Sequence, residues 1–251
     1  MEPKNAITVV QSNFHWYPDL PPDPHLIAVM GAPRSGNTLM AQLLATGFLD
    51  TQALPREAHP LHYRRQHTDA RWIIAKRPRA SAALSQILSR EMRVVCMQRD
   101  PRSVITSTYP GDAQGFRVDY PRWRLYDRRI RAFAGHPSLL TVRFEDLISA
   151  PARTQFFLSE SIGLRQQRPF AECYKHFATE SFDPNVKVLN GVRPLDTTVQ
   201  LKWRDHPERI LKTVKEFPEL LDDLVTLGYE TDHGWFEEYL AQVDPHVARH
   251  I

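Results

Sequence analysis

Apolar residues along the chain form two kinds of pattern that alternate with each other. The run Leu26 to Met30 is apolar at every position, as in a parallel strand that is covered on both faces. Directly after it, from Thr38 to Phe48, apolar side chains recur every three or four residues, which predicts a helix. The stretch between these two segments therefore connects a buried strand to an amphipathic helix.

The same alternation continues along the chain. Further strands are predicted at 71–76, 93–99 and 139–147. Helices are predicted at 80–90, 100–109, 151–164, 206–217 and 218–230. Strands that alternate with helices indicate an α/β fold, a single three-layer domain over 1–251 with a mostly parallel central sheet flanked by helices. Ligands of such sheets bind at the carboxyl ends of the strands.

Three segments do not belong to this alternation of strands and helices. Residues 1–25 are rich in proline and aromatic residues, and we expect an extended lead-in on the surface. Residues 205–251 are expected to form C-terminal helices. The stretch 176–202 has no clear periodicity, and a loop of that length inside a compact domain is usually functional or mobile.

The connection after the first strand reads "GAPRSGNT", residues 31–38. Its spacing is that of an ATP-binding P-loop, but Asn37 replaces the lysine that reaches the β- and γ-phosphates. A glycine-bounded turn into a helix still directs backbone N–H groups and the helix dipole at one point, which suits any phosphate-like group. With a cation at Arg34, the loop fits a single diester-like group held by the segment Ser35-Gly36-Asn37-Thr38.

A second candidate anion site follows the strand at 93–99. Arg99 ends that strand, and Ser107 comes eight residues later in the predicted helix. An arginine at a strand end and a hydroxyl on the next helix can converge on one phosphate. The pair Asp100-Pro101 suits a helix N-cap followed by proline in the first turn.

Taken together, "GAPRSGNT", the Arg99…Ser107 pair and "LLTVRFEDLISAP" resemble the motifs of sulfotransferases that use 3′-phosphoadenosine 5′-phosphosulfate (PAPS). The resemblance extends over roughly 26–230, since "LKWRDHPERI" and "LVTLGYE" are similar to the C-terminal section of that family. It implies a P-loop nucleotide-kinase-like fold. The arginine in the loop is closer to the bacterial, glycan and protein-tyrosine branches, where other members have lysine.

The resemblance also implies roles for individual residues. The loop would hold the 5′-phosphosulfate, with Arg34 at the bridging oxygen and the sulfonate, and Arg99 with Ser107 would hold the 3′-phosphate. Lys76 resembles a lysine that ends a strand near the transferred group. Glu57 is the expected general base, and His59 or His62 is the alternative.

A late loop is expected to close over the nucleotide. Lys202 or Arg204 would meet the 3′-phosphate there, and Arg193 is a further candidate. This sequence lacks the Arg-Lys-Gly triplet of the family, which leaves the register of that loop open. Glu145 and Asp146 in "RFEDL" are interpreted as structural.

The donor would be PAPS, with adenosine 3′,5′-bisphosphate as the product and no metal. Two alternatives remain: a nucleotide kinase-like enzyme with a degenerate P-loop, and a non-catalytic nucleotide-binding protein. The acceptor would be a hydroxyl group of a small molecule, glycan or metabolite, and 51–70 with 110–125 are expected to shape its cleft. Rings for stacking are available at Tyr109, Phe116, Tyr120 and Trp123, and a polar or anionic acceptor is suggested by Arg56, Arg64, Arg65 and Arg117.

Composition adds limits to this picture. A formal net charge of +3 lacks the dense basic face of nucleic-acid binders, so no nucleic-acid partner is expected. No apolar run approaches the roughly 20 residues that cross a bilayer, and no secretion signal is recognisable. Two cysteines cannot form a disulfide scaffold. We therefore expect a cytoplasmic protein, and a homodimer is compatible with the family resemblance.

Overall fold

The computed structural model describes residues 25–54, 56–62, 70–108, 115–177 and 193–243. The predicted lead-in lies outside these ranges except for His25, and so does most of the aperiodic stretch 176–202. Tyr109, Arg64 and Arg65, which were considered for the acceptor cleft, are also outside the described residues.

Five strands form a parallel sheet in the order β2-β3-β1-β4-β5. The strands are β1 His25–Gly31, β2 Thr51–Ala53, β3 Trp72–Lys76, β4 Arg93–Gln98 and β5 Leu139–Arg143. The chain leaves β1 toward β2 and β3 on one side and later returns to β4 on the other. The carboxyl end of β1 is therefore a topological switch point, where open parallel sheets bind their ligands.

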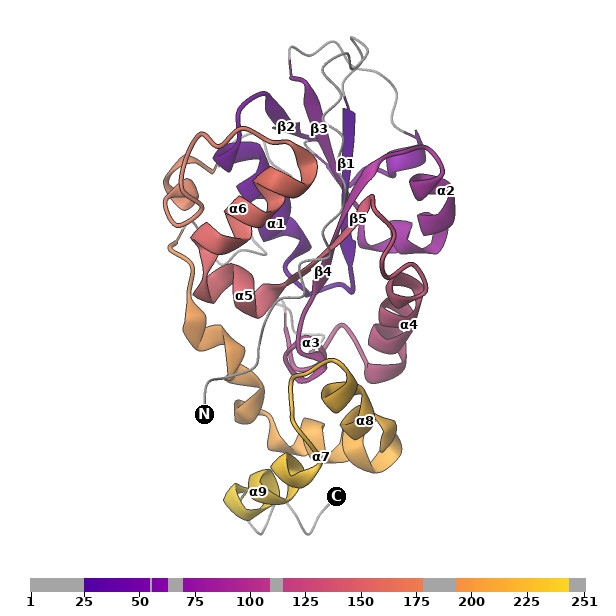
Figure 1. The fold of residues 1–251 in the computed structure, drawn as a ribbon. Coiled ribbons are helices and arrows are strands. Elements are labelled where there is room, and N and C mark those ends of the chain that lie inside the picture. Colours follow the sequence, from indigo (N-terminus) through magenta and orange to yellow (C-terminus); the bar gives the residue numbers. More distant parts are fainter. Residues whose placement is uncertain (1–24, 55, 63–69, 109–114, 178–192, 244–251) are drawn as a thin grey trace.

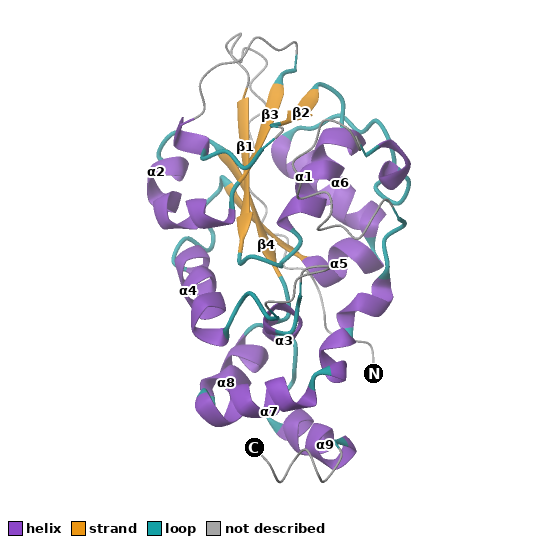
Figure 2. Ribbon diagram, turned by 180° about the vertical axis from the view of Figure 1, so that it is seen from behind, coloured by secondary structure: helices purple, strands orange, loops and turns teal. Residues whose placement is uncertain are grey.

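Helices cover both faces of this sheet (Figures 1 and 2). The nine α-helices in the described residues are α1 Asn37–Gly47, α2 Leu84–Leu88, α3 Pro101–Ile105, α4 Tyr120–Arg131, α5 Phe144–Ser149, α6 Pro151–Ile162, α7 Pro207–Glu216, α8 Glu219–Thr226 and α9 Gly234–Gln242. Figure 1 shows α1, α5 and α6 on one face and α2 and α4 on the other. The expected α/β fold with a parallel central sheet between helical layers is confirmed.

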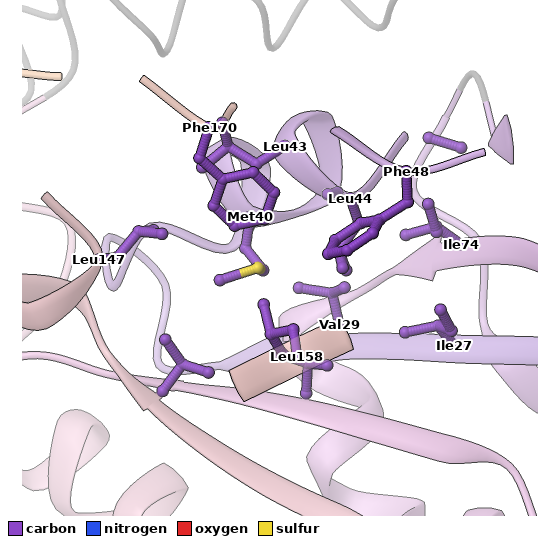
Figure 3. Packing of buried hydrophobic residues seen from close by; sticks show 14 of the residues in the cluster. Ile27, Val29, Met40, Leu43, Leu44, Phe48, Ile74, Leu147, Leu158 and Phe170 are labelled. Atoms are coloured by element: carbon purple, nitrogen blue, oxygen red, sulfur yellow. The ribbon is translucent and has the colours of Figure 1, made fainter. Parts of the chain in front are cut away.

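The pleat of β1 divides the core into two layers. Ile27 and Val29 point into a cluster with α1, α5 and α6, whereas Ala28 and Met30 pack with the segment from η2, a 3₁₀ helix at Pro78–Ala83, to α2. All four side chains are fully buried. Figure 3 shows the first cluster, in which helix side chains including Met40 lie over the strand residues. Burial on both faces explains why the β1 sequence is apolar without alternation.

The C-terminal helices form a third cluster beyond the carboxyl end of the sheet, as Figure 1 shows for α7 to α9. A buried arginine joins them to α3. The Arg102 guanidinium forms an ion pair with Asp100 at 2.7 Å and another with Glu230, and lies over the rings of Trp203 and Trp235 at 4.2 and 4.5 Å. The segment that carries Lys202 is thereby held against the end of β4.

Several predicted elements differ from the structure, including the helix predicted at 80–90, which is formed by η2 followed by α2, and the helix predicted at 218–230, which ends at Thr226. The predicted strand 139–147 ends at Arg143, because Phe144 begins α5 with Glu145 and Asp146 in the first turn, where carboxylates interact well with the helix dipole. The predicted helix 100–109 ends at Ile105, in a run of β-branched residues that favours helix poorly. Ser107 therefore lies in an irregular segment beyond α3, not inside a helix.

The prediction for 110–125 is also corrected in part. Asp119 caps α4 by accepting a hydrogen bond from the Arg122 N–H at 2.8 Å, and the helix directs Tyr120 and Trp123 inward. Each of these two side chains is 2% exposed, and Tyr120 donates to the Asp223 carboxylate at 2.7 Å. They belong to the C-terminal core and are not available to an acceptor.

Candidate active site

The loop between β1 and α1 is a tight turn in which two positions require glycine. Gly31 and Gly36 have φ values of 149° and 91°. A Cβ at Gly31 would lie 2.3 Å from the Met97 carbonyl oxygen, and one at Gly36 would lie 2.6 Å from the Phe144 ring. The loop backbone therefore packs directly on β4 and α5.

Asn37, at the position of the P-loop lysine, stabilises this loop through a hydrogen bond within it. Its side-chain Nδ2 donates to the Ala32 carbonyl at 2.9 Å, and the Ser35 N–H donates to the same oxygen at 3.1 Å. Asn37 is 4% exposed, so its amide is directed into the loop. The start of α1 has no side-chain cap and no acidic residue in its first turn, which leaves a positive helix end facing the cavity.

Arg34 connects the two predicted anion sites. It lies in the left-handed region, with φ 75°, a conformation that is uncommon for a residue other than glycine. Its Nε donates to the Ser107 hydroxyl at 2.9 Å and its Nη2 to the Thr108 carbonyl at 2.9 Å. The Nη1 of Arg99 donates to the Arg34 carbonyl at 2.9 Å. Arg34, Arg99 and Ser107 therefore form one connected unit.

Arg99 is held in a largely enclosed position. Its guanidinium lies 4.4 Å from the centre of the Phe144 ring. Burial lowers the pKa of Arg99, and the nearby Glu145 carboxylate opposes that shift. The Arg99 Nε and the Ser35 hydroxyl are buried without a hydrogen-bond partner among the described residues. Unpaired buried donors are costly, and an anion beside Arg99, which lines the cavity, would reduce that cost, whereas Ser35 is 1% exposed and lies outside the lining.

Glu145, interpreted as structural from the sequence, supports the end of β4. Its carboxylate accepts hydrogen bonds from the Asp100 N–H at 3.0 Å and from the Tyr229 hydroxyl at 3.3 Å. Burial raises the pKa of Glu145, partly offset by the Asp100 N–H. Both carboxylate oxygens are thus used in joining the strand end to the C-terminal helices.

Lys76 and Glu57 form a pair at the mouth of the cavity. The Lys76 ammonium lies 3.0 Å from the Glu57 carboxylate and 3.4 Å from the Thr38 hydroxyl. The side chain of Lys76 is 11% exposed and that of Glu57 is 44% exposed. A cation therefore joins the end of the loop to a carboxylate that solvent or a substrate can reach.

The remaining candidates divide into those inside and outside the cavity. Lys202 and Arg193 line it, with Arg193 paired to Asp196 at 3.4 Å. Arg204 lies outside the lining and donates to Gln242 at 3.2 Å.

The two histidines considered as alternative bases also lie outside the lining. The rings of His59 and His62 stack with centroids 4.8 Å apart. Burial lowers the pKa of His59, and the charges of His62 and Arg77 act in the same direction.

All of the inward-facing groups line one cavity of about 730 Å³ at the carboxyl ends of β1, β3 and β4. Its charge is strongly unbalanced, since only Glu57 and Asp196 in the lining are acidic. The eight basic lining residues are Arg34, Lys76, Arg79, Arg99, Arg117, Arg122, Arg193 and Lys202. Such a cavity suits a ligand with several negative charges.

Arg79 and Arg122 were missed from the sequence. In a chain with 32 basic residues, nothing in their local pattern separates them from ordinary surface arginines. They line the cavity because η2 and α4 are adjacent in the fold, a contact between segments about 40 residues apart in sequence.

Comparison with solved structures identifies the fold. A sulfotransferase domain from the curacin biosynthetic pathway superimposes with a TM-score of 0.54 over 72% of this chain and 90% of its own, at 18% identity. The chain has the fold of a sulfotransferase domain. A second such domain, from the olefin synthase of Synechococcus PCC 7002, gives a TM-score of 0.51 at 20% identity, over 76% of this chain and 91% of its own.

Among the comparisons with known proteins, only the comparison with solved structures finds sulfotransferases. Comparison of the sequence with protein-family profiles gives no match, and neither does comparison with curated proteins. The predicted fold is therefore confirmed. Within the described residues, no helix combines the length and the apolar character that crossing a bilayer requires.

Proposed function

We propose that the protein is a PAPS-dependent sulfotransferase that transfers a sulfonate group to a hydroxyl group of an acceptor and releases adenosine 3′,5′-bisphosphate. The observation that carries this proposal is the connected unit of Arg34, Arg99 and Ser107 in one cavity. It brings a phosphate-binding loop and a second cationic site within reach of one another. A nucleotide with anionic groups at both its 5′ and 3′ positions needs this arrangement.

The residues present fit such a donor. The uncapped start of α1 and the donors of the loop suit a 5′-phosphosulfate. A 3′-phosphate, with a charge of about −1.5 to −2 at pH 7, suits the enclosed Arg99 with Ser107, and Lys202 is a further cation in the same cavity. The ATP alternative is disfavoured because Asn37 is directed into the loop and cannot replace the P-loop lysine.

An apolar wall beside the loop is available for the adenine ring. Leu39 on α1 and Ile148 on α5 line the cavity together with Phe177, Leu195 and Val199. These residues lie on the α1 and α5 face of the sheet, where they adjoin the main apolar cluster. A purine ring has two apolar faces, so this wall provides the contact that a phosphate loop alone lacks.

The chemistry assigned to the protein is proton removal and charge stabilisation. When bound, PAPS supplies an activated sulfonate. Glu57 accepts the proton of the acceptor hydroxyl, for which its carboxylate is accessible at the cavity mouth. Lys76 and Arg34 stabilise the negative charge that develops on the loop side, since both lie in the cavity wall next to the helix start.

The first test is ligand binding measured by thermal unfolding. Adenosine 3′,5′-bisphosphate at 100 times its Kd stabilises a one-site protein by about 2.7 kcal/mol, which raises the Tm. We expect this rise with the bisphosphate and a smaller one with ATP and Mg²⁺. Stabilisation by ATP alone would contradict the proposal and favour a kinase-like enzyme.

The second test is turnover. Incubation with labelled PAPS and a library of hydroxyl compounds, read by mass spectrometry for an added sulfonate, is expected to reveal an acceptor. Binding of the bisphosphate without any turnover of donor, in the presence or absence of acceptors, would favour the non-catalytic alternative. The Glu57→Gln variant provides the matched inactive control.

A further inference from the structure

A second group of arginines lines the same cavity as the donor loop. Arg79 lies on η2, Arg117 precedes α4, and Arg122 lies in the first turn of α4. All three side chains are exposed. They line the same cavity, in which η2 packs against α4 and the Arg122 Nη1 donates to the Arg117 carbonyl at 3.2 Å. We call Arg79, Arg117 and Arg122 the arginine wall.

The arginine wall adjoins the proposed acid–base pair. Arg79 is three residues past Lys76, whose ammonium contacts the Glu57 carboxylate. An acceptor whose hydroxyl lies at Glu57 occupies the cavity that the arginine wall also lines. The apolar residues proposed for adenine come instead from α1, α5 and the segment around Leu195, on the other face of the sheet (Figure 1).

Local carboxylates do little to neutralise Arg79 and Arg122. Asp119 is the acidic residue nearest in sequence, and it is engaged as the cap of α4 with the Arg122 N–H at 2.8 Å. It is absent from the cavity lining, as are all other described acidic residues except Glu57 and Asp196. Within the described part of the chain, Arg79 and Arg122 form no ion pair. Like charges gathered at one surface repel each other, and a bound anion removes that repulsion.

We propose that the acceptor is an anionic alcohol whose phosphate or carboxylate group, remote from the reacting hydroxyl, binds the arginine wall. The inference rests on the proposed sulfotransferase function and adds the class of substrate. Guanidinium groups present paired N–H donors that match both of these anions, and a neutral alcohol leaves them unused. The wall then orients the acceptor with its hydroxyl toward Glu57.

The test measures binding of matched ligands to protein saturated with adenosine 3′,5′-bisphosphate. The probes are 6-hydroxyhexyl phosphate, 6-hydroxyhexanoate and the neutral 1,6-hexanediol, followed by ligand-observed NMR titration. We expect both anions to bind at least about tenfold more tightly than the diol, because a hydrogen bond to a charged group contributes that much or more. The Arg79→Gln and Arg122→Gln variants, singly and together, should remove this preference. Arg128→Gln, an exposed arginine on α4 outside the cavity, should retain it.

The outcomes separate the two proposals. If the bisphosphate binds but the anionic probes show no advantage over the diol, the arginine wall is not an acceptor site, while the sulfotransferase proposal stands. If Arg79→Gln and Arg122→Gln weaken the bisphosphate but not adenosine 5′-monophosphate, the wall binds the 3′-phosphate of the donor and the inference is wrong. If the bisphosphate itself does not bind, the proposed function fails and the acceptor assignment fails with it.

Discussion

The Nε of Arg34 donates a hydrogen bond to the Ser107 hydroxyl at 2.9 Å, across 73 positions of sequence. This contact joins the turn after β1 to the segment after α3, so the two predicted anion sites share a wall. Arg34 is held on its other side by Arg99, which donates to the Arg34 carbonyl. The position of the loop guanidinium is therefore set by residues of the second site.

Ser107→Ala is expected to weaken nucleotide binding in two ways. Under the proposed function, the variant loses the hydroxyl that would bind the 3′-phosphate, and it also loses the hydrogen-bond partner of the Arg34 side chain. We expect the Kd for adenosine 3′,5′-bisphosphate to rise about tenfold or more, and the Kd for adenosine 5′-monophosphate to rise by less. Isothermal titration calorimetry measures both. Ser89→Ala removes an exposed hydroxyl at the end of α2 and should bind as wild type does. An unchanged Kd for both nucleotides would show that Ser107 has neither role.

Gly36→Ala is expected to destabilise the protein because the added methyl group clashes with Phe144. A control variant distinguishes this clash from the backbone strain of a positive φ. The new methyl group would lie 2.6 Å from the Phe144 ring, in addition to the cost of φ 91°. Overpacking of this kind costs about 1–3 kcal/mol, measured as the free energy of unfolding in urea. Gly163→Ala is the matched control, because φ there is 81° and nothing lies within 4 Å of the added Cβ. Equal losses in the two variants would mean that contact with Phe144 is unimportant.

The sequence predicts an element correctly where its hydrophobic pattern matches the burial of that element in the fold. The uninterrupted apolar run of β1 and the helical spacing of α1 predict their own elements and the loop between them. The end of β5 was placed too late because Phe144 is apolar enough to continue a strand, whereas the carboxylates after it favour a helix start. Strand and helix preferences overlap at such a junction, and packing decides between them.

The candidate site was predictable only in part, for a related reason. Residues at strand ends, such as Lys76 and Arg99, could be placed in a common cavity because parallel strands end at the same edge of the sheet. Tyr120 looked available for stacking, but its burial depends on a helix whose cap and core partners lie far along the chain. The place of Arg122 in the cavity lining could not be predicted from the sequence, because it depends on the packing of α4 against η2.

Glu145→Gln is expected to change how stability depends on pH. Burial raises the pKa of Glu145, so the folded protein keeps this proton to a higher pH than the unfolded chain, whose glutamates titrate near about 4.3. Between these two values the unfolded state binds fewer protons, and the contribution of Glu145 to stability falls as pH rises through that interval. The glutamine variant lacks this loss. Its free energy of unfolding relative to wild type should therefore increase from about pH 4.5 to pH 7.

Urea unfolding at several pH values between these limits measures the difference. Glutamine keeps an oxygen that can accept from the Asp100 N–H, so the variant retains the hydrogen bond at the end of β4. Glu160→Gln, an exposed glutamate on α6, controls for the loss of one carboxylate. A difference between Glu145→Gln and wild type that stays constant or declines with rising pH would be contrary to this assignment.

Glu57→Gln and His59→Ala decide which residue is the base. Glu57 lines the cavity and contacts Lys76, whereas His59 lies outside the lining and stacks on His62. Under the proposed function, Glu57 is therefore the base. Loss of a general base lowers the rate by about 10² to 10⁴. We expect that fall in kcat for Glu57→Gln, with the Kd for adenosine 3′,5′-bisphosphate within about twofold of wild type, a change of under 1 kcal/mol. His59→Ala should keep its kcat.

Release of bisphosphate from PAPS in the presence of an acceptor provides the rate, and calorimetry provides the Kd. A fully active Glu57→Gln protein would remove the assignment, and simultaneous loss of activity in His59→Ala would transfer it to the histidine.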